Sequence, residues 1–383
     1  MARRARQPKP ARQKGPILPW IALGLLLACL AVAALWAGWH ARHAGPPPAA
    51  VLPLAAPIQA APAPKSAPAP ASPPPAPANK PAAASQAGGT PPAQPTPPVQ
   101  PPQPPQPPQP PPEIALGPVP DPALVAKSPH GLLPVIGPDG REAWQVYARP
   151  FADLDKRPRI GILIADLGLS QATTKAAIQE LPGAVTLGFV PYAGDLQSAL
   201  AQARTAGHEA ILELPMEPDD YPTDDPGPHA LLTSLSVADN IDRLDWQLAR
   251  VTGYIGVTNY MGSKFIATPD EIRPILEAVK SRGLMFLDGG GTQHSIAVRI
   301  ARDAGLPYAV SNLSLDAKAS GDGIDAALAA LEKIARTSGA AVGIGHPYPV
   351  TLNHIAAWAR TLPAKGLVLA PVSAIVNRQS EQK

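Results

Sequence analysis

The sequence predicts an α/β protein whose folded part is a distorted (β/α) barrel, on the basis of three observations. Short apolar segments alternate with segments of helical composition from Arg159 onward, which is typical of βαβ units and a parallel sheet. Seven or eight such strands in one region favour a barrel over a flat doubly wound sheet. Most of the 54 prolines in the 383 residues precede Asp121, so residues 121–383 form one large domain.

The chain begins with a basic tail, residues 1–16, followed by an uncharged apolar run at residues 17–39. This run has the length of a transmembrane helix, and the basic residues predict that the amino terminus stays in the cytoplasm. We therefore expect a single-pass inner-membrane anchor with the later domain in the periplasm. A cleaved signal peptide is the alternative, but apolar residues continue past A-V-A-A and favour an uncleaved anchor. The lipobox-like L-L-A-C ends at Cys29, the single cysteine, and is followed by more apolar helix.

Residues 44–120 consist largely of Pro, Ala and Gln, with repeats of P-P-Q. This composition cannot bury a core and favours a disordered, extended linker. At about 3.1 Å per residue, the linker can reach on the order of 200 Å. It is either an inert tether or a docking site for an envelope partner that binds proline-rich segments. The net charge of +3, concentrated in the tail, does not suggest nucleic acid as a partner.

The folded domain is predicted to open with a β-hairpin formed by residues 131–136 and 142–148, joined by the turn sequence G-P-D-G. A buried strand follows at residues 160–165, because that run is apolar and rich in β-branched residues. Ser170 is a good N-cap for a helix at residues 171–181. The later predicted strands are residues 185–189, 210–214, 256–258, 285–287, 308–310, 341–344 and 367–369. The later predicted helices are residues 236–250, 269–282, 324–336 and 351–360.

Polar side chains recur where the predicted strands end, and the carboxyl ends of parallel strands are where α/β proteins build their sites. Each residue alone has a structural explanation, but their recurrence favours a site. These residues are Asp166, Glu213 with Glu217, Asn259 with Tyr260, Asp288 with His294, and His346. In contrast, His208, His229 and His354 fall away from strand ends and are expected to be solvated. No glycine-rich phosphate loop follows any strand, which disfavours a nucleotide enzyme.

Six motifs occur in order between about Leu132 and Arg378. They are G-I-L-I-A-D-L-G-L-S, V-T-L-G-F-V-P-Y, G-H-E-A-I-L-E-L-P-M-E-P, G-V-T-N-Y-M-G-S-K-F, L-M-F-L-D and G-I-G-H-P-Y-P. This set resembles the divergent polysaccharide deacetylase family of bacteria. The resemblance implies a deformed (β/α) barrel of the polysaccharide deacetylase type and a carbohydrate ligand from the cell wall. It also implies that active relatives hold a divalent metal with one Asp and two His, and use a second Asp as base and a late His as acid.

The chain departs from the family pattern at three of these positions. Ala165 precedes Asp166 where the family has two aspartates, while Glu213 and Tyr260 stand where it tends to have histidines. The base and both histidine ligands are therefore missing or replaced. A metal held by Asp166 and Glu213 would have hard oxygen ligands, which suit Mg, Mn or Ca better than zinc.

The residues that remain are assigned as follows: His346 and Asp288 as catalytic, and Asn259, Tyr260, Glu217 and His294 as substrate-binding. Three functions remain open. The favoured one is a glycan-binding protein with a degraded catalytic site, acting on peptidoglycan or another N-acetylated polysaccharide. The second is an active N-deacetylase that depends on a divalent metal of unknown identity. The third is a non-catalytic envelope scaffold.

Overall fold

The computed structural model describes residues 114–152, 156–290 and 295–379. The predicted basic tail, membrane anchor and most of the linker lie outside these residues, as does His294. The chain divides into two units at Pro98, and the second unit is the one described here. Within the described residues no helix has both the length and the apolar character needed to cross a membrane.

The second unit is an α/β domain in which a two-stranded hairpin precedes one nine-stranded sheet. Its strands are β1 Val125–Ser128, β2 Gly131–Pro134, β3 Arg159–Leu167, β4 Thr186–Phe189, β5 Ala210–Met216, β6 Gly256–Met261, β7 Met285–Asp288, β8 Tyr308–Val310, β9 Leu313–Ser314, β10 Ala340–Gly345 and β11 Val368–Leu369. The large sheet has the order β8-β7-β6-β5-β4-β3-β10-β9, and β11 pairs with β3. Every pairing in this sheet is parallel.

The sheet curls into a nearly closed barrel. The strands β8 and β9 lie at opposite ends of the strand order, yet Ser311 and Asn312 alone separate them in the sequence. The Ser311 N–H donates to the Asp288 carbonyl on β7 at 2.8 Å, and the Asn312 N–H donates to the Val342 carbonyl on β10 at 2.7 Å. These two residues therefore bridge the two edges of the sheet, and the predicted distorted barrel is confirmed.

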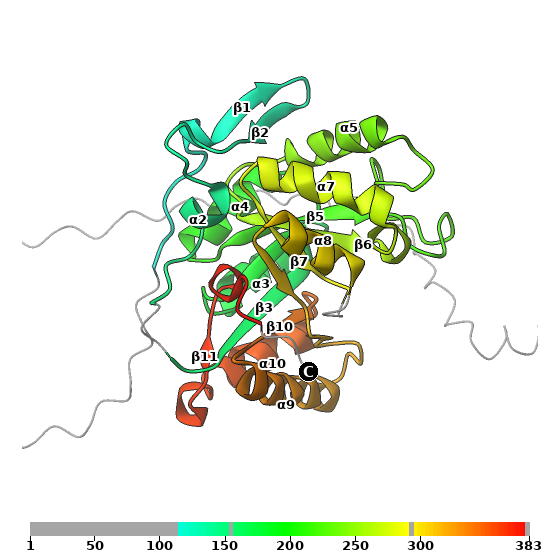
Figure 1. The fold of residues 1–383 in the computed structure, drawn as a ribbon. Helices are drawn as coiled ribbons and strands as arrows, with labels where there is room; N and C mark the ends of the chain where they lie inside the picture. Colours follow the sequence, from blue (N-terminus) through cyan, green and yellow to red (C-terminus); the bar gives the residue numbers. More distant parts are fainter. Residues whose placement is uncertain (1–113, 153–155, 291–294, 380–383) are drawn as a thin grey trace, which may run out of the picture. The chain divides into compact units, whose positions relative to one another are not determined.

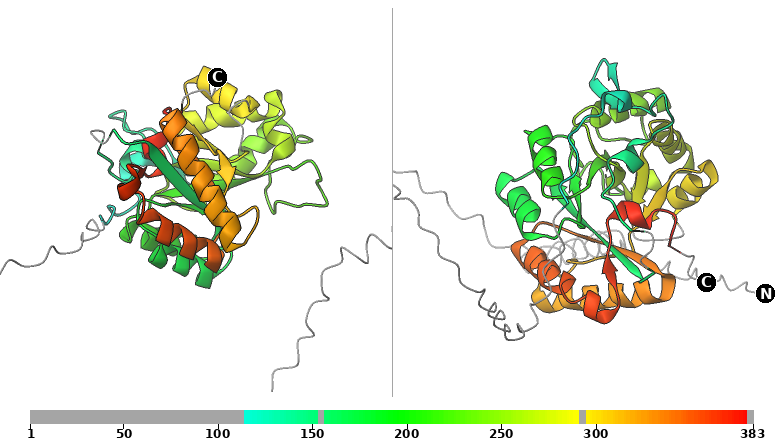
Figure 2. Two further views of the ribbon diagram at one scale, coloured as in Figure 1. Left: turned by 90° about the horizontal axis from the view of Figure 1, so that it is seen from below. Right: turned by 90° about the vertical axis from the view of Figure 1, so that its left-hand side faces the viewer.

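The helices surround the outside of the curled sheet (Figures 1 and 2). They are α2 Ala143–Val146, α3 Gln171–Glu180, α4 Leu196–Thr205, α5 Val237–Leu248, α6 Ser263–Ile266, α7 Pro269–Ser281, α8 Ile296–Ala304, α9 Gly321–Ser338 and α10 Pro349–Ala359, with the 3₁₀ turns η1 Pro122–Leu124, η2 Pro363–Lys365 and η3 Val372–Ile375. Eight of the nine residues of β3 are buried, because helices cover one face and the barrel interior covers the other. The predicted N-cap is also confirmed, since the Ser170 hydroxyl accepts from the Thr173 N–H.

The predicted hairpin is wrong in its position. The structure pairs β1 with β2 in antiparallel register, and residues 142–148 contain the short helix α2 instead of a strand. The reason is the spacing of Ala143 and Tyr147, which are four residues apart and both buried. This spacing places both side chains on one face of a helical turn. The predicted G-P-D-G turn is confirmed, because the Gly137 N–H donates to the Arg141 carbonyl. The chain after this turn forms the helix α2 and not a strand.

The amino-terminal part of the domain contacts the barrel before the predicted boundary at Asp121. The Leu116 N–H donates to the Arg204 carbonyl at 2.9 Å. The buried Arg204 guanidinium in turn donates to the carbonyls of Gly117 and Tyr147. Residues 116–117, which the sequence places in the linker, are therefore fixed to the domain.

Gly256 provides a test of the packing between β6 and β7. A Cβ added at Gly256 would overlap the backbone carbonyl of Met285 on the neighbouring strand, and backbone cannot move aside as a side chain can. We expect Gly256→Ala to lower the free energy of unfolding by about 3 kcal/mol, the upper part of the usual overpacking range. Gly194→Ala is the matched control, because no atom lies within 4 Å of its added Cβ. Equal denaturant midpoints for the two variants would contradict this packing.

Candidate functional site

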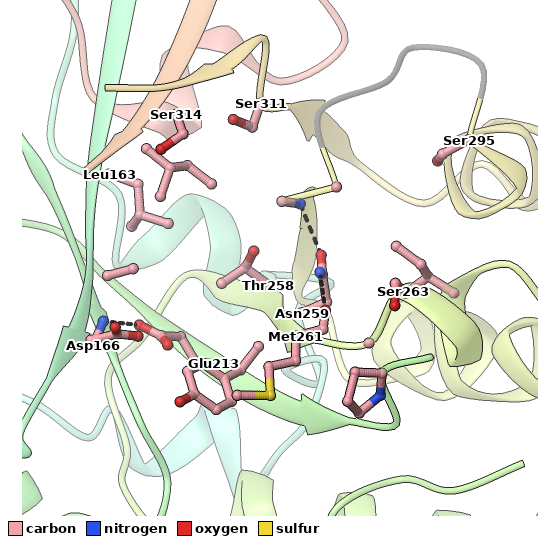
Figure 3. Close-up of a pocket in the computed structure, with 18 of the residues that line it drawn as sticks. Leu163, Asp166, Glu213, Thr258, Asn259, Met261, Ser263, Ser295, Ser311 and Ser314 are labelled. Carbon is pink, nitrogen blue, oxygen red and sulfur yellow. Dashed lines mark hydrogen bonds between the residues drawn. The ribbon is translucent and has the colours of Figure 1, made fainter. Parts of the chain in front are cut away.

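A cleft of about 950 Å³ lies at the carboxyl ends of the barrel strands. Its lining comes from β3, β5, β6 and β10, from the segment after β7, and from the link between β8 and β9. Figure 3 shows these residues around one open space. The cleft is therefore located where the sequence predicts a site.

Asp166 enters the cleft from β3 through an irregular backbone. The pairing of β3 with β4 shifts register between Ile164 and Leu167, and Asp166 has a φ of 63°. Asp is among the few residues that tolerate this left-handed conformation. The irregularity places Ala165 and Asp166 side by side on the cleft wall, and 29% of the Asp166 side chain is exposed. Strain of this kind is typical of functional positions.

Glu213 lies on β5 next to Asp166 and is almost fully buried. Its Oε1 accepts the Asp166 backbone N–H at 2.7 Å (Figure 3). The carboxyl group fits there because a Cβ at Gly188 would lie 2.7 Å from the same oxygen. Burial and the Asp166 charge raise the pKa of Glu213 well above its usual value, and the two side chains also share a hydrogen bond. Glu213 and Asp166 therefore form a hydrogen-bonded pair of carboxyl groups on the cleft wall.

His346 follows β10 and is held by Asp316, a residue that the sequence analysis missed. His346 Nδ1 lies 2.9 Å from Asp316 Oδ1, and the His346 backbone N–H donates to Asp316 Oδ2 at 2.7 Å. Thr351 adds a third hydrogen bond to Asp316 at 3.0 Å. His346 Nε2 lies 3.8 Å from Asp166 Oδ2. This arrangement orients Nε2 toward the cleft, as a general acid requires.

The His346–Asp316 contact shifts the pKa of both partners. The hydrogen bond to Asp316 raises the pKa of His346, although burial opposes this shift. Burial raises the pKa of Asp316, but the hydrogen bonds from His346 outweigh burial and the net pKa is lowered. Burial likewise raises the pKa of Asp166, and the nearby His346 opposes that increase.

Tyr260 and Asn259 both line the cleft from β6. The hydroxyl of Tyr260 is hydrogen-bonded to Tyr192, and burial together with the Asp166 charge raises the pKa of Tyr260. The Asn259 Oδ1 accepts the Gly289 N–H at 2.8 Å, and its Nδ2 donates to the Met261 carbonyl at 2.8 Å. Asn259 therefore ties β6 to the segment after β7, while Tyr260 stands beside Asp166.

Asp288 and Glu217, also predicted as site residues, are not among the residues that line the cleft. Asp288 is fully buried, and it accepts hydrogen bonds from the Gly290 N–H and the Ser295 hydroxyl. Glu217 accepts from the backbone and hydroxyl of Thr233 and from Lys264. Both carboxylates hold the loops that frame the cleft.

One histidine prediction is wrong. His208 is fully buried instead of solvated, and its ring nitrogens lie 2.8 Å from the Val185 carbonyl and 3.1 Å from the Ile178 carbonyl. His229 is exposed and stacks on Trp246, whereas His354 is half-buried and pairs with Asp325.

The side chains present do not fit the metal site of the family that the sequence resembles. Among the described residues, no three Asp, Glu, His or Cys side chains are grouped as a metal would require. Asp166 and Glu213, the two predicted ligands, are adjacent, but Glu213 is almost fully buried and its Oε1 already accepts the Asp166 N–H at 2.7 Å. His346 Nδ1 is used by Asp316. No catalytic step through a metal is derived from this arrangement.

Comparisons with known proteins agree with the fold. A crystal structure of an uncharacterized protein from Agrobacterium tumefaciens C58 is 37% identical, with a TM-score of 0.62, over 64% of this chain and 100% of that one. An uncharacterized protein of Haemophilus influenzae is 28% identical over 206 residues, which are 54% of this chain and 72% of its own length. The uncharacterized Escherichia coli protein YibQ is 24% identical over 221 residues, which are 57% and 67% of the two chains. Residues 162–376 match the family profile described as "Divergent polysaccharide deacetylase". This match covers more than half of the chain, which therefore belongs to the divergent polysaccharide deacetylase family.

Proposed function

We propose that the cleft binds an N-acetylated glycan, with cell-wall peptidoglycan as the polymer, and that it does not deacetylate this glycan efficiently. The observation that carries the proposal is Ala165. Its methyl group lines the cleft beside Asp166, where the family pattern has the aspartate that acts as base.

The chemistry of the remaining side chains supports binding more strongly than turnover. A general base typically contributes 10²- to 10⁴-fold to a rate, and Ala165 cannot supply one. Glu213 is almost fully buried, and burial raises its pKa. The cleft still contains polar groups that can form hydrogen bonds with a sugar, namely those of Asp166, Tyr260 and His346.

An active deacetylase is the second candidate, and the His346–Asp316 pair is the observation that favours it. An oriented imidazole with a raised pKa is suited to protonate a leaving amine. This pair is also compatible with binding alone, because the same N–H can donate to a sugar oxygen.

Glycan binding gives a direct test. We expect the full-length chain to bind a soluble N-acetylated cell-wall fragment, and Asp166→Ala or His346→Ala to weaken this binding. Loss of a hydrogen bond to a charged group costs about 1.5–3 kcal/mol, which corresponds to an increase in Kd of about 10- to 100-fold. His354→Ala is the matched control, because that histidine also pairs with an aspartate but does not line the cleft. Calorimetric titration that detects no binding by the wild-type chain would overturn the proposal.

We also propose that residues 17–39 anchor the chain in the inner membrane and that the domain lies in the periplasm. The length of the apolar run and the basic residues before it support this topology. Protease added to spheroplasts is then expected to digest the domain. Survival of the domain until the membrane is lysed would show that the topology is different.

A further inference from the structure

Two carboxyl groups, those of Asp166 and Glu213, line the cleft. No Lys or Arg is among the described residues that line it. The nearby Lys264 is bonded to Glu217 Oε1 at 2.7 Å. The charged neighbour of Asp166 is His346, at 3.8 Å, and Asp316 already balances that imidazole at 2.9 Å. Asp166 therefore presents a carboxylate to the cleft without a full positive charge to compensate it.

The wall contributed by β6 and by the β8–β9 link carries hydroxyl groups, and one of them, on Thr258, has no partner among the described residues. Thr258 is 2% exposed, and its Oγ1 has no hydrogen-bond partner among the described residues. Ser311 is also buried and lines the cleft. In Figure 3 the side chains of Thr258, Ser311 and Ser314 face the same open space. A buried hydroxyl without a partner is costly in a folded protein, so Thr258 indicates a place where a ligand group completes the hydrogen bonding.

Two aromatic side chains near Asp166, those of Tyr260 and Tyr192, also favour a positively charged ligand, because aromatic rings attract cations. Tyr260 lies beside Asp166 and is bonded to Tyr192. A carboxylate with adjacent aromatic rings is a typical environment for an ammonium group. A metal ion needs a fixed set of about three protein ligands, which the described residues of the cleft do not offer. An organic cation has no such requirement, so these side chains are better suited to an ammonium group.

We propose that the cleft selects glycan segments that carry a free amino group, with the ammonium of a glucosamine-type sugar paired to Asp166 and the neighbouring sugar hydroxyls bonded to Thr258 and Ser311. This inference rests on the proposed glycan-binding function and names its preferred ligand. The reaction that supplies this ligand is amide hydrolysis, in which an N-acetylated sugar and water give the free amine and acetate. Another enzyme performs that step, and this protein binds its product within the partly N-acetylated polymer. Glycan segments dense in carboxylate or phosphate are disfavoured, because the described lining contains no Lys or Arg and His346 is already paired with Asp316.

Competing oligosaccharides test the selectivity. The full-length chain is titrated at physiological salt, and at a pH where sugar amines are protonated, with short oligomers of glucosamine, of N-acetylglucosamine and of galacturonic acid. A pairing between charged groups is worth about 1.5–3 kcal/mol. The glucosamine oligomer is therefore expected to bind about 10-fold or more tightly than the N-acetylated oligomer, and the acidic oligomer not to bind.

Two substitutions in the cleft test which side chains bind the sugar, and a third on the surface is the control. Asp166→Asn keeps the shape and removes the charge, so it should abolish the preference for glucosamine. Asp242→Asn, at an exposed aspartate on α5, should retain the preference. Thr258→Val should weaken the binding of the glucosamine and N-acetylglucosamine oligomers by about 2- to 10-fold, because the hydroxyl that bonds the sugar is lost. The melting temperature should stay unchanged, because an apolar side chain of the same shape replaces a hydroxyl that has no partner within the described part of the protein. Equal binding of both oligomers, or a preference that survives in Asp166→Asn, overturns this inference and leaves the proposed function intact. Failure of all oligomers to bind overturns both.

Discussion

Asp316→Ala is expected to lower the free energy of unfolding by about 3 kcal/mol, which is the usual cost of removing one partner from a buried pair. Asp316 accepts hydrogen bonds from the His346 backbone, the His346 ring and Thr351, and its side chain is fully buried. Alanine leaves all three donors without this acceptor. For a domain of this size, the melting temperature should fall by about 6–12 °C.

The chain contains a matched control for this substitution. Asp325 bonds to His354 Nδ1 at 2.7 Å, but 62% of its side chain is exposed. Asp325→Ala removes the same kind of pair from the surface, where ion pairs contribute about 1 kcal/mol or less. Similar losses of stability in the two variants would contradict the role given to Asp316.

The pH dependence of stability reports on the same pair. Because the pKa of His346 is raised in the folded state, its contribution is complete below its unfolded pKa of about 6.5 and is lost as pH rises through the folded value. Because the pKa of Asp316 is lowered, its contribution is present above about pH 4 and is lost as pH falls through its folded value. Stability from the pair is therefore greatest between about pH 4 and 6.5. Asp316→Asn should flatten the decline in stability above about pH 6.5, as measured by denaturant titrations that extend from the pH range of greatest stability into the alkaline side.

Combining Ala165→Asp, Glu213→His and Tyr260→His is expected to create a zinc site in the cleft. All three positions line the cleft, and their strands β3, β5 and β6 already place them near Asp166. The combination supplies the missing Asp at position 165 and places two His at positions 213 and 260 beside Asp166, and zinc binds such a set of His and Asp better than an oxygen-rich set. Loss of supporting contacts alone changes metal affinity by about 10- to 100-fold, so restoring ligands should raise zinc affinity by about 100-fold or more.

Zinc titration by calorimetry measures this gain directly. The double variant Ala165→Asp with Tyr260→His, which keeps Glu213, is the control and should gain much less. Equal zinc affinity in the wild-type chain and the triple variant would show that these positions do not converge as described.

The strands of the large sheet other than β9 were predictable from the sequence because the sheet is buried on both faces, so that β3, for example, is a continuous apolar run. The hairpin was misplaced because a Gly-Pro-Asp-Gly turn precedes a helix as readily as a strand. In that segment the spacing of Ala143 and Tyr147 was the better signal.

The site was predictable in part. Asp166, Glu213, Tyr260 and His346 line one cleft because strand ends of a barrel converge. Asp288 also follows a strand, but the Gly290 N–H and the Ser295 hydroxyl bind its carboxylate behind the lining, and strand position alone does not reveal side-chain direction. Asp316 was missed because β9 before it has two residues, too few to produce a pattern.

Release of acetate is the measurement that tests the central claim most directly. The wild-type full-length chain is incubated with a soluble N-acetylated cell-wall fragment and added Mn, Zn or Co, while binding of the same fragment is measured in parallel. We predict binding without acetate above the level of the Asp166→Ala variant, because Ala165 stands where the family pattern has its catalytic base. Robust acetate release by the wild-type chain that Asp166→Ala abolishes would contradict this account and establish the protein as an active deacetylase.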